Sequence, residues 1–429
     1  MRIGIFIDDY LPSVHGVATS TTNLKEALEA LGHEVYVIAP RSKAYEDDDD
    51  HIIRVPSAKN YVFDKRETGV IYPGLARRLD KYEFDIVHSQ MQFYVGVLAH
   101  SVAKRQNIPH VTTVHTLYTE LIDDYPLMVT AGIIALTAAL PIALRTRPIL
   151  PTPSREQLRT MSKDAIKDTF SHQGWRLTAA FANKCDACIS PSNHLARILI
   201  DEGGLTVPCY VHPNGINTKR YRDADPNDSP IKKNPGEKFI ISVARMSPEK
   251  RQKALIEAMP HIPDESIKLV LTGGGPYEQE LRMRAEELDV TRRVIFTGMQ
   301  PSDKVAALLK QADVFSLASY HFDNQPMTFL EAASSGLPIV YCDEQMTEGL
   351  TERNSILTDG IDGPSLARTF NELFSDPHRL ENLSRGSLEV AQEFDSTTMT
   401  KKMVELYEIL INDHRILTKD HRPSPYRRF

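Results

Sequence analysis

The sequence predicts an α/β protein built from two doubly wound domains, and three observations support this fold class. Short apolar segments suited to buried parallel strands alternate with helical segments along most of the 429 residues. This alternation begins at residue 2 and begins again near residue 205. A chain of this length also fits two or three domains that each bury a core. We therefore expect two successive α/β domains of similar size.

The first domain is expected over residues 1–204. It opens with a strand, a helix with leucines on one face and a second strand, which together have the size of one right-handed βαβ unit. The strands expected in this domain lie at 2–7, 34–39, 85–88, 109–115 and 186–190.

The second domain is expected over residues 205–395, where strand-like segments return. They lie at 210–212, 239–243, 269–272, 294–296, 314–317 and 339–341. We expect residues 396–429 to form a helix that returns to the first domain, followed by a disordered tail. Ligands of doubly wound sheets bind at the carboxyl ends of the strands, so the loops that follow strands are the place to look for a site.

Composition excludes several classes of protein. The formal net charge is −7, from 50 Lys and Arg against 57 Asp and Glu, whereas nucleic-acid binders are strongly basic. Four cysteines are too few for a disulfide framework and favour a reducing compartment. The N-terminus reads as a strand rather than a signal peptide. We expect a cytoplasmic protein with no nucleic-acid partner.

Two cations mark the loop after the strand at 239–243. Arg245 and Lys250 lie between the end of this strand and the next helix, where the charge of a diphosphate would be neutralised. The second marked loop is Gly273-Gly274-Gly275, after the strand at 269–272. These glycines suit either a tight turn or a close approach of backbone to a ligand, and the residues alone leave both readings open.

A third set of residues surrounds a short helix near residue 330. Asp323 lies on the preceding loop, and Glu331 lies in the first turns of a helix that Gly336 and Pro338 end. The free N–H groups at such a helix start can receive phosphate oxygens, and a carboxylate can accept hydrogen bonds from ribose hydroxyls. This arrangement favours a nucleotide-sugar site.

These motifs, taken in order, resemble those of the retaining glycosyltransferases of family 4, which have the GT-B fold of two Rossmann-like domains facing across a cleft. The resemblance covers about residues 1–400. It rests on Arg245 and Lys250, the three glycines and the segment from Glu331 to Pro338. It also rests on four further short matches, which are Gly16 in the first loop, His115, Pro191-Ser192 and Asn214-Gly215.

The resemblance implies a role for each matching residue. Arg245 and Lys250 hold the donor diphosphate, Asp323 contacts the donor sugar, and His115 lies over that sugar near the acceptor; these four are the expected catalytic residues. Glu331 binds the ribose, and Gly16 lets the first loop approach the donor. The remaining residues expected at the donor are Gly273, Gly274, Gln325, Met327, Thr328 and Asn214. The resemblance implies neither a metal nor another cofactor.

Two departures from the family pattern stand near the sugar. The first acid of the paired-acid motif is Asp323, one methylene shorter than the usual glutamate. Pro326 replaces a usual glycine and offers no N–H to a phosphate. These departures motivate one alternative from another class, a non-catalytic nucleotide-sugar-binding subunit.

Within the family, several segments are similar to diacylglycerol glucosyltransferases, which act at the cytoplasmic membrane surface. They are Asp8–Pro12, His115–Tyr118 with Tyr118 on the acceptor side, and Gln325 with Thr328. The expected function is therefore transfer of a hexose from a nucleotide-diphospho sugar to a lipid hydroxyl. A soluble saccharide acceptor is the alternative within the same class.

A membrane-facing segment is expected over residues 126–184. Residues 126–144 carry no charge, which fits a buried helix of the first domain, an interfacial hairpin or, less well because of Pro141, a spanning helix. Residues 145–184 carry a net charge of +5. Arg155, Arg159, Lys163 and Lys167 form one stripe at helical spacing, which suits anionic headgroups or else a solvated face. Phe170 lies elsewhere on the same helix and Trp175 beyond it.

Two short motifs resemble metal sites, but we expect neither to bind a metal. Cys185 and Cys188 overlap an apolar strand, so we expect core packing. The acidic run at residues 46–50 is expected to be a solvated loop.

Overall fold

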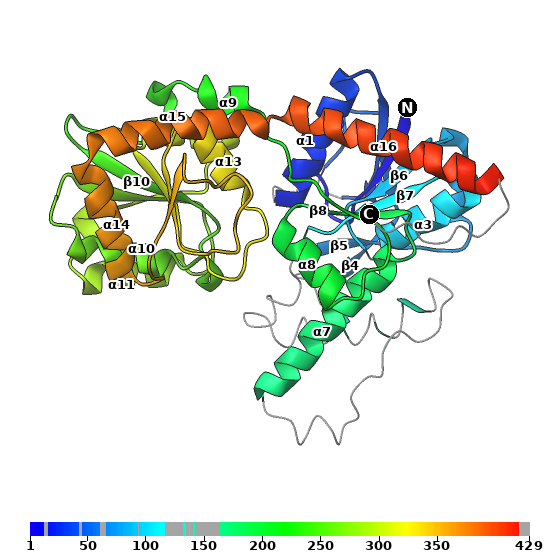
Figure 1. Ribbon diagram of the computed structural model, residues 1–429, viewed down its shortest axis with the longest axis horizontal. Coiled ribbons are helices and arrows are strands. Elements are labelled where there is room, and N and C mark those ends of the chain that lie inside the picture. The colour runs from blue at the N-terminus through cyan, green and yellow to red at the C-terminus, as the bar shows by residue number, and fades with distance from the viewer. Residues whose placement is uncertain are drawn as a thin grey trace. The chain divides into compact units, whose positions relative to one another are not determined.

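The computed structural model describes residues 1–12, 16–42, 45–60, 66–92, 94–115, 132–133, 137, 140–141 and 163–419. The chain divides into two compact units (Figure 1). The first unit comprises Met1–Pro213 and Met399–Phe429, and the second comprises Asn214–Thr398.

The first unit is built on a parallel seven-stranded sheet in the order β3-β2-β1-β6-β7-β8-β9. Its strands are β1 (Arg2–Phe6), β2 (Glu34–Pro40), β3 (Ile52–Val55), β6 (Ile86–Ser89), β7 (His110–Thr113), β8 (Ala187–Ser190) and β9 (Cys209–Val211). A separate antiparallel pair joins β4 (Ser57–Asn60) to β5 (Arg66–Gly69). The helices are α1 (Gly16–Ala30), α2 (Leu75–Arg78), η1 (Asp80–Tyr82), α3 (Val95–Gln106), α7 (Lys163–Ala182), α8 (Asn193–Asp201) and α16 (Ser396–Lys419).

Both faces of this sheet are covered, because successive side chains of a strand point to opposite faces. Ile3 and Ile5 of β1 pack with Leu28 of α1 and Tyr407 of α16. Phe6 packs instead in the cluster that contains α3. Burial on both faces explains why β1 reads as a continuous apolar run rather than an alternating one.

The second unit has a parallel six-stranded sheet in the order β12-β11-β10-β13-β14-β15. Its strands are β10 (Lys238–Val243), β11 (Ile267–Thr272), β12 (Val294–Gly298), β13 (Val314–Leu317), β14 (Ile339–Tyr341) and β15 (Ser355–Leu357). The α-helices are α9 (Thr218–Arg222), α10 (Gln252–Ala258), α11 (Glu278–Glu287), α12 (Ser302–Gln311), α13 (Met327–Ser334), α14 (Gly363–Ser375) and α15 (Pro377–Glu393). The 3₁₀ turns are η2 (Pro226–Asp228), η3 (Pro248–Lys250), η4 (Met259–His261) and η5 (Thr291–Arg293).

The core of the second unit also alternates along each strand. Ile240 and Leu269 face the cluster that contains α10, α11 and α14. Phe239, Ile241 and Val270 face the opposite cluster, which contains α12 and α13. Packing on both faces of the sheet holds the strands in place, and the loops expected to form the site leave from the carboxyl ends of these strands.

The units divide between Pro213 and Asn214, later than the expected boundary at residue 204. The expectation that residues 210–212 open the second sheet is wrong. Cys209 of β9 pairs with Cys188 of β8, so this strand closes the edge of the first sheet. Strand spacing along the sequence does not determine which sheet an edge strand joins. The sequence also missed β3, β4, β5 and β15, which are only three or four residues long.

Residues 126–144 lie almost entirely outside the described part of the chain. Within the residues that the structure describes, no helix has the length and apolar character needed to cross a bilayer. The tail from residue 420 onward is also outside the described residues.

Candidate functional site

In the second unit, Lys250 and Asp323 form an ion pair. The Nζ atom of Lys250 contacts Oδ1 of Asp323, and the two side chains are only 17% and 13% exposed. The ring of Phe322 lies 5.1 Å from the same Nζ atom. Oδ2 of Asp323 is buried and has no hydrogen-bond partner within the described residues. The structure thus brings two of the expected catalytic residues together and leaves one carboxylate oxygen for a ligand.

Gln325 lies on the same loop and is held by Asn214. The amide Oε1 of Gln325 accepts hydrogen bonds from the backbone N–H and the side-chain Nδ2 of Asn214, both at 2.8 Å. Nε2 of Gln325 is buried and has no partner among the described residues. This loop therefore offers a buried acceptor at Asp323 and a buried donor at Gln325. Unsatisfied buried polar atoms are costly, so together they indicate a polar ligand.

Arg245 is exposed on the loop that follows β10. Its carbonyl oxygen accepts a hydrogen bond of 2.8 Å from Nε2 of Gln252, which is buried at the start of α10. The backbone of this loop is therefore anchored while the guanidinium stays at the surface. An anchored cation at the carboxyl end of a parallel strand suits a diphosphate.

The glycine loop packs against the Arg245 loop. The N–H of Met246 donates to the carbonyl of Gly274 at 3.0 Å. A Cβ atom on Gly273 would lie 2.0 Å from the carbonyl oxygen of Ala244, and one on Gly275 would lie 2.1 Å from that of Met246. A Cβ on Gly274 would meet only the Met299 side chain, at 3.6 Å. Gly273 and Gly275 are therefore required for packing, and Gly274 is not.

Helix α13 carries Glu331 near its start, with Met327 and Thr328 in its first turn. Pro326 precedes the helix, and no side chain caps it. Tyr221 of α9 hydrogen-bonds to Glu331. Burial raises the pKa of Glu331 to about 7, against the lowering effects of the Tyr221 hydroxyl and Arg220. A carboxyl that changes charge near neutral pH thus lies one turn from the uncapped helix start.

In the first unit, His115 follows β7. Its Nε2 atom lies 2.6 Å from Oε1 of Gln90, which follows β6. Gly16 is the first residue of α1, and a Cβ there would meet no described residue within 4 Å. At the end of β1, Oδ1 of Asp8 accepts the N–H of Val95 at 2.8 Å, and burial raises the pKa of Asp8 to about 7. Polar groups thus gather at the carboxyl edge of the sheet.

Most of the expected membrane-facing residues lie outside the described part of the chain. Tyr118, Arg155 and Arg159 lie outside the described residues. Lys163 and Lys167 are in the first turns of α7, where the structure describes the backbone but not these side chains.

The expectation that Phe170 and Trp175 support headgroup binding is wrong. Phe170 is 2% exposed and Trp175 is 3% exposed. Trp175 packs against Val114, Leu195 and Leu199 in the core of the first unit. Their positions in α7 point both rings into the protein, so neither reaches a membrane.

The acidic run at residues 46–50 is mostly exposed, as expected, but two of its residues also pair with cations. Asp47 makes two hydrogen bonds of 2.7 Å with Arg54. Asp49 forms an ion pair of 2.6 Å with Lys25, which is buried on α1. Long-range pairing of this kind leaves no trace in the local sequence. The two cysteines of the other motif, Cys185 and Cys188, are free and buried.

One group among the described residues has the geometry to hold a metal ion. It consists of His321, Asp343 and Glu344. The two carboxylate oxygens of Asp343 already accept the backbone N–H groups of His321 and Gln345, at 2.7 and 3.0 Å. These bonds explain the cluster as loop structure.

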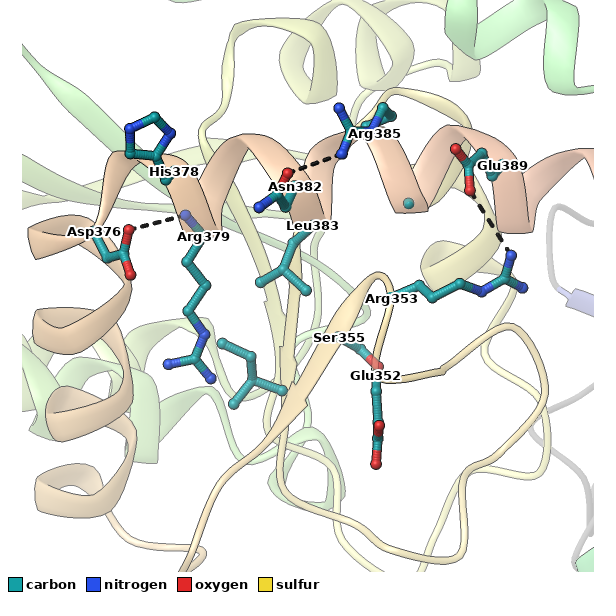
Figure 2. A pocket seen from close by; sticks show the side chains of 12 residues that line it. Glu352, Arg353, Ser355, Asp376, His378, Arg379, Asn382, Leu383, Arg385 and Glu389 are labelled. Atoms are coloured by element: carbon teal, nitrogen blue, oxygen red, sulfur yellow. Dashed lines mark hydrogen bonds and ion pairs between the residues drawn. The ribbon is translucent and has the colours of Figure 1, made fainter.

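A pocket of about 520 Å³ lies beside helix α15 and strand β15 (Figure 2). Arg379 and Leu383 point from the helix to the side on which Ser355 lies, whereas His378 points to the opposite side. Arginines and acids both line the pocket, and Arg353 is paired with Glu389 at 3.8 Å. None of the residues expected at the donor lines it. We therefore do not assign the donor to this pocket.

Two family descriptions match consecutive parts of the chain. Glycosyltransferase Family 4 matches residues 14–220, and Glycosyl transferases group 1 matches residues 223–389. Together with the two parallel α/β units of the GT-B fold, these matches show that the chain belongs to the family 4 glycosyltransferases. The family resemblance and the fold class expected from the sequence are both confirmed.

Two curated relatives match nearly the whole chain. The alpha-monoglucosyldiacylglycerol synthase of Streptococcus pneumoniae is 28% identical over 95% of this chain and 82% of its own length. The enzyme of the same name from Acholeplasma laidlawii is 28% identical over 96% of this chain and 98% of its own. A GDP-mannose-dependent alpha-mannosyltransferase of Corynebacterium glutamicum is 25% identical over 79% of this chain and 72% of its own length.

Solved structures share the fold at lower identity. The Anabaena protein HepE in complex with UDP has a TM-score of 0.69 and 17% identity over 95% of this chain and all of its own. Sucrose-phosphate synthase from Thermosynechococcus elongatus also has a TM-score of 0.69 and 17% identity, over 96% of this chain and all of its own.

Proposed function

We propose that this glycosyltransferase moves a hexose from a nucleotide-diphospho sugar to the hydroxyl of diacylglycerol or a related membrane lipid. The loop from Asp323 to Gln325 carries the donor part of the proposal. Two buried polar atoms there have no partner in the described part of the chain, and they lie beside the Lys250 cation. The structure of HepE with UDP-glucose supports a nucleotide-sugar donor. The glucosyldiacylglycerol synthases that match nearly the whole chain support the lipid acceptor.

The proposed chemistry is mainly electrostatic. As the glycosidic bond to the donor phosphate breaks, negative charge develops on the leaving diphosphate, and Arg245 and Lys250 stabilise it without a metal. Oδ2 of Asp323 accepts a hydrogen bond from a sugar hydroxyl. The acceptor hydroxyl attacks from the side of the leaving phosphate and gives that phosphate its proton, so the anomeric configuration is retained. His115 lies over the donor sugar.

Transfer assays with matched acceptors test this function. The wild-type enzyme is incubated with UDP-glucose or GDP-mannose and either vesicles that contain diacylglycerol or a soluble saccharide. We expect a glycolipid from the vesicles and at most traces of product from the saccharide. Product from the saccharide alone would remove the lipid acceptor, and binding of donor with no transfer to either would favour a non-catalytic subunit.

Membrane association is proposed to depend on the basic stripe, with the enzyme peripheral at the inner face of the cell membrane. Changing Arg155, Arg159, Lys163 and Lys167 to Glu should reduce sedimentation with anionic vesicles at least tenfold, since each cation near the surface contributes about 1 kcal/mol. Affinity for UDP-glucose should stay the same. Unchanged sedimentation would make the stripe a solvated face.

Donor affinity should depend on pH through Glu331. Its raised pKa of about 7 means that the carboxyl is ionised above neutral pH and protonated below it. A carboxylate accepts ribose hydroxyls better than a neutral acid does, so the Kd for UDP-glucose should rise about fivefold to tenfold from about pH 8 to about pH 6. UDP-glucose is the right probe because its diphosphate does not titrate in this range. Calorimetry measures the affinity.

Two variants identify Glu331 as the source of this dependence. Glu331→Gln should bind weakly at both pH values and remove the slope. Tyr221→Phe removes a hydrogen bond that lowers the pKa of Glu331, so the midpoint should move to higher pH. The same slope in Glu331→Gln would rule out this carboxyl.

A further inference from the structure

A buried chain of hydrogen bonds joins His115 to the C-terminal helix α16 within the first unit. Nε2 of His115 lies 2.6 Å from Oε1 of Gln90, and Nε2 of Gln90 lies 3.3 Å from both ring nitrogens of His88. Nδ1 of His88 lies 2.6 Å from the hydroxyl of Tyr407 on α16, and its Nε2 lies 2.6 Å from Oγ1 of Thr113. Four side chains thus connect three elements of this unit to His115.

The chain is shielded from solvent along most of its length. His88 is 1% exposed, Gln90 2% and Tyr407 0%. Tyr407 is among the largest fully buried side chains and packs with Met403 and Leu410, so its hydroxyl needs a partner inside the protein. His88 supplies that partner. Inside a core, such bonds are stronger than in water and any broken one is costly, which makes the chain rigid.

Proton positions along the chain follow from its chemistry. An amide oxygen only accepts, so Nε2 of His115 carries a hydrogen and donates it to Oε1 of Gln90. Burial holds the pKa of His88 well below its usual value and raises that of Tyr407, so the imidazole is neutral and the phenol keeps its proton. The Tyr407 hydroxyl therefore donates to Nδ1 of His88, and Nε2–H of His88 donates to Oγ1 of Thr113. The amide nitrogen of Gln90 makes only a longer contact of 3.3 Å with both ring nitrogens, so it is held mainly by packing against the fixed ring.

We propose that Tyr407, His88 and Gln90 are positioning residues, which hold the His115 ring in one orientation and in the tautomer with hydrogen on Nε2. The inference rests on the proposed function, because His115 is the group that contacts the donor sugar there. It assigns a role in the reaction to helix α16, most of which, from Met399 on, belongs to the first unit. A hydroxyl buried in the core thereby influences the sugar-transfer step through two side chains.

A double-mutant cycle separates positioning from simple stabilisation. Tyr407→Phe removes one oxygen and should lower kcat about threefold to tenfold at a temperature where the variant is fully folded, which corresponds to one lost hydrogen bond. In a His115→Ala background the same change should alter kcat less than about 1.5-fold. Equal factors in both backgrounds would overturn the proposal. Tyr36→Phe is the matched control, because the Tyr36 hydroxyl donates to Oε1 of Glu34 at 2.6 Å and takes no part in these hydrogen bonds. This variant should leave kcat unchanged.

Gln90 offers a conservative rescue. Gln90→Leu removes the acceptor for Nε2–H of His115 and should lower kcat about tenfold. Gln90→Glu keeps an acceptor at the same place and should recover most of that loss. A Gln90→Glu variant as slow as Gln90→Leu would overturn the positioning role.

Ring ¹⁵N NMR tests the chain without any activity. The His115 signals are assigned by their loss in His115→Gln. We expect the Nε2–H tautomer in the wild type and a mixture of both tautomers in Tyr407→Phe. An unchanged tautomer in that variant would overturn the inference, whereas a wild type with the expected tautomer but no transfer would overturn only the proposed function.

Discussion

Lys250→Ala should lower kcat for sugar transfer by about 100-fold to 1000-fold, which is the usual effect of removing a charge aimed at a developing anion. The ammonium group of Lys250 is largely buried in the second unit, where it also holds the side chain of Asp323 in an ion pair. Removing it leaves the carboxylate without its partner and the leaving diphosphate without one of its two proposed cations. Steady-state kinetics with saturating donor measures the loss.

Two further variants make the Lys250 result specific. Lys238→Ala removes a cation from the amino end of β10, where Nζ of Lys238 forms an exposed ion pair of 3.0 Å with Asp264. This variant should keep kcat within about twofold of the wild-type value. Lys250→Arg keeps the charge and should recover part of the activity. If Lys250→Ala stays folded by circular dichroism with kcat within threefold of the wild type, Lys250 does not stabilise the leaving group.

The fold could be predicted well because buried parallel strands leave a strong signal. Each central strand, such as β1 and β10, is an apolar run covered on both faces, and the helices between strands set the alternation. Edge strands leave a weaker one. β9 has only three residues with partly exposed side chains, so its membership in the first sheet depends on hydrogen bonds to β8. Because β9 belongs to the first sheet, the boundary between the units lies after Pro213 and not at residue 204 as predicted.

The candidate site was predictable only where it lies on local motifs. Arg245, Lys250 and Glu331 each follow a strand or start a helix, so their spacing along the chain indicates where they gather. Their partners do not show in the sequence, since Tyr221 is far from Glu331 along the chain. Tyr407 is even farther from its partner His88, 319 residues along the sequence. Long-range contacts of this kind follow from the packing of whole elements, and no local pattern encodes them.

The sequence alone leaves open whether the three glycines serve a tight turn or a contact with a ligand, and the structure gives different answers for Gly274 and Gly275. Gly275 lies against the backbone of Met246, where an added Cβ would be 2.1 Å from the carbonyl oxygen. A backbone atom cannot move aside as the end of a flexible side chain can. Gly274 has room for a methyl group, because its nearest neighbour is the Met299 side chain at 3.6 Å. Turn packing therefore explains Gly275, and Gly274 remains available to a ligand.

Gly275→Ala should lower the free energy of unfolding by about 3 kcal/mol and weaken UDP-glucose binding more than tenfold, because the glycine loop must move away from the loop that carries Arg245. Gly274→Ala is the matched control for folding and should keep the melting temperature of the wild type. Denaturant unfolding and calorimetry measure the two effects. Equal stability of the two variants would contradict the packing role of Gly275. Weaker UDP-glucose binding in a fully stable Gly274→Ala variant would place the donor against this glycine, since the added methyl group would then meet the ligand and not the protein.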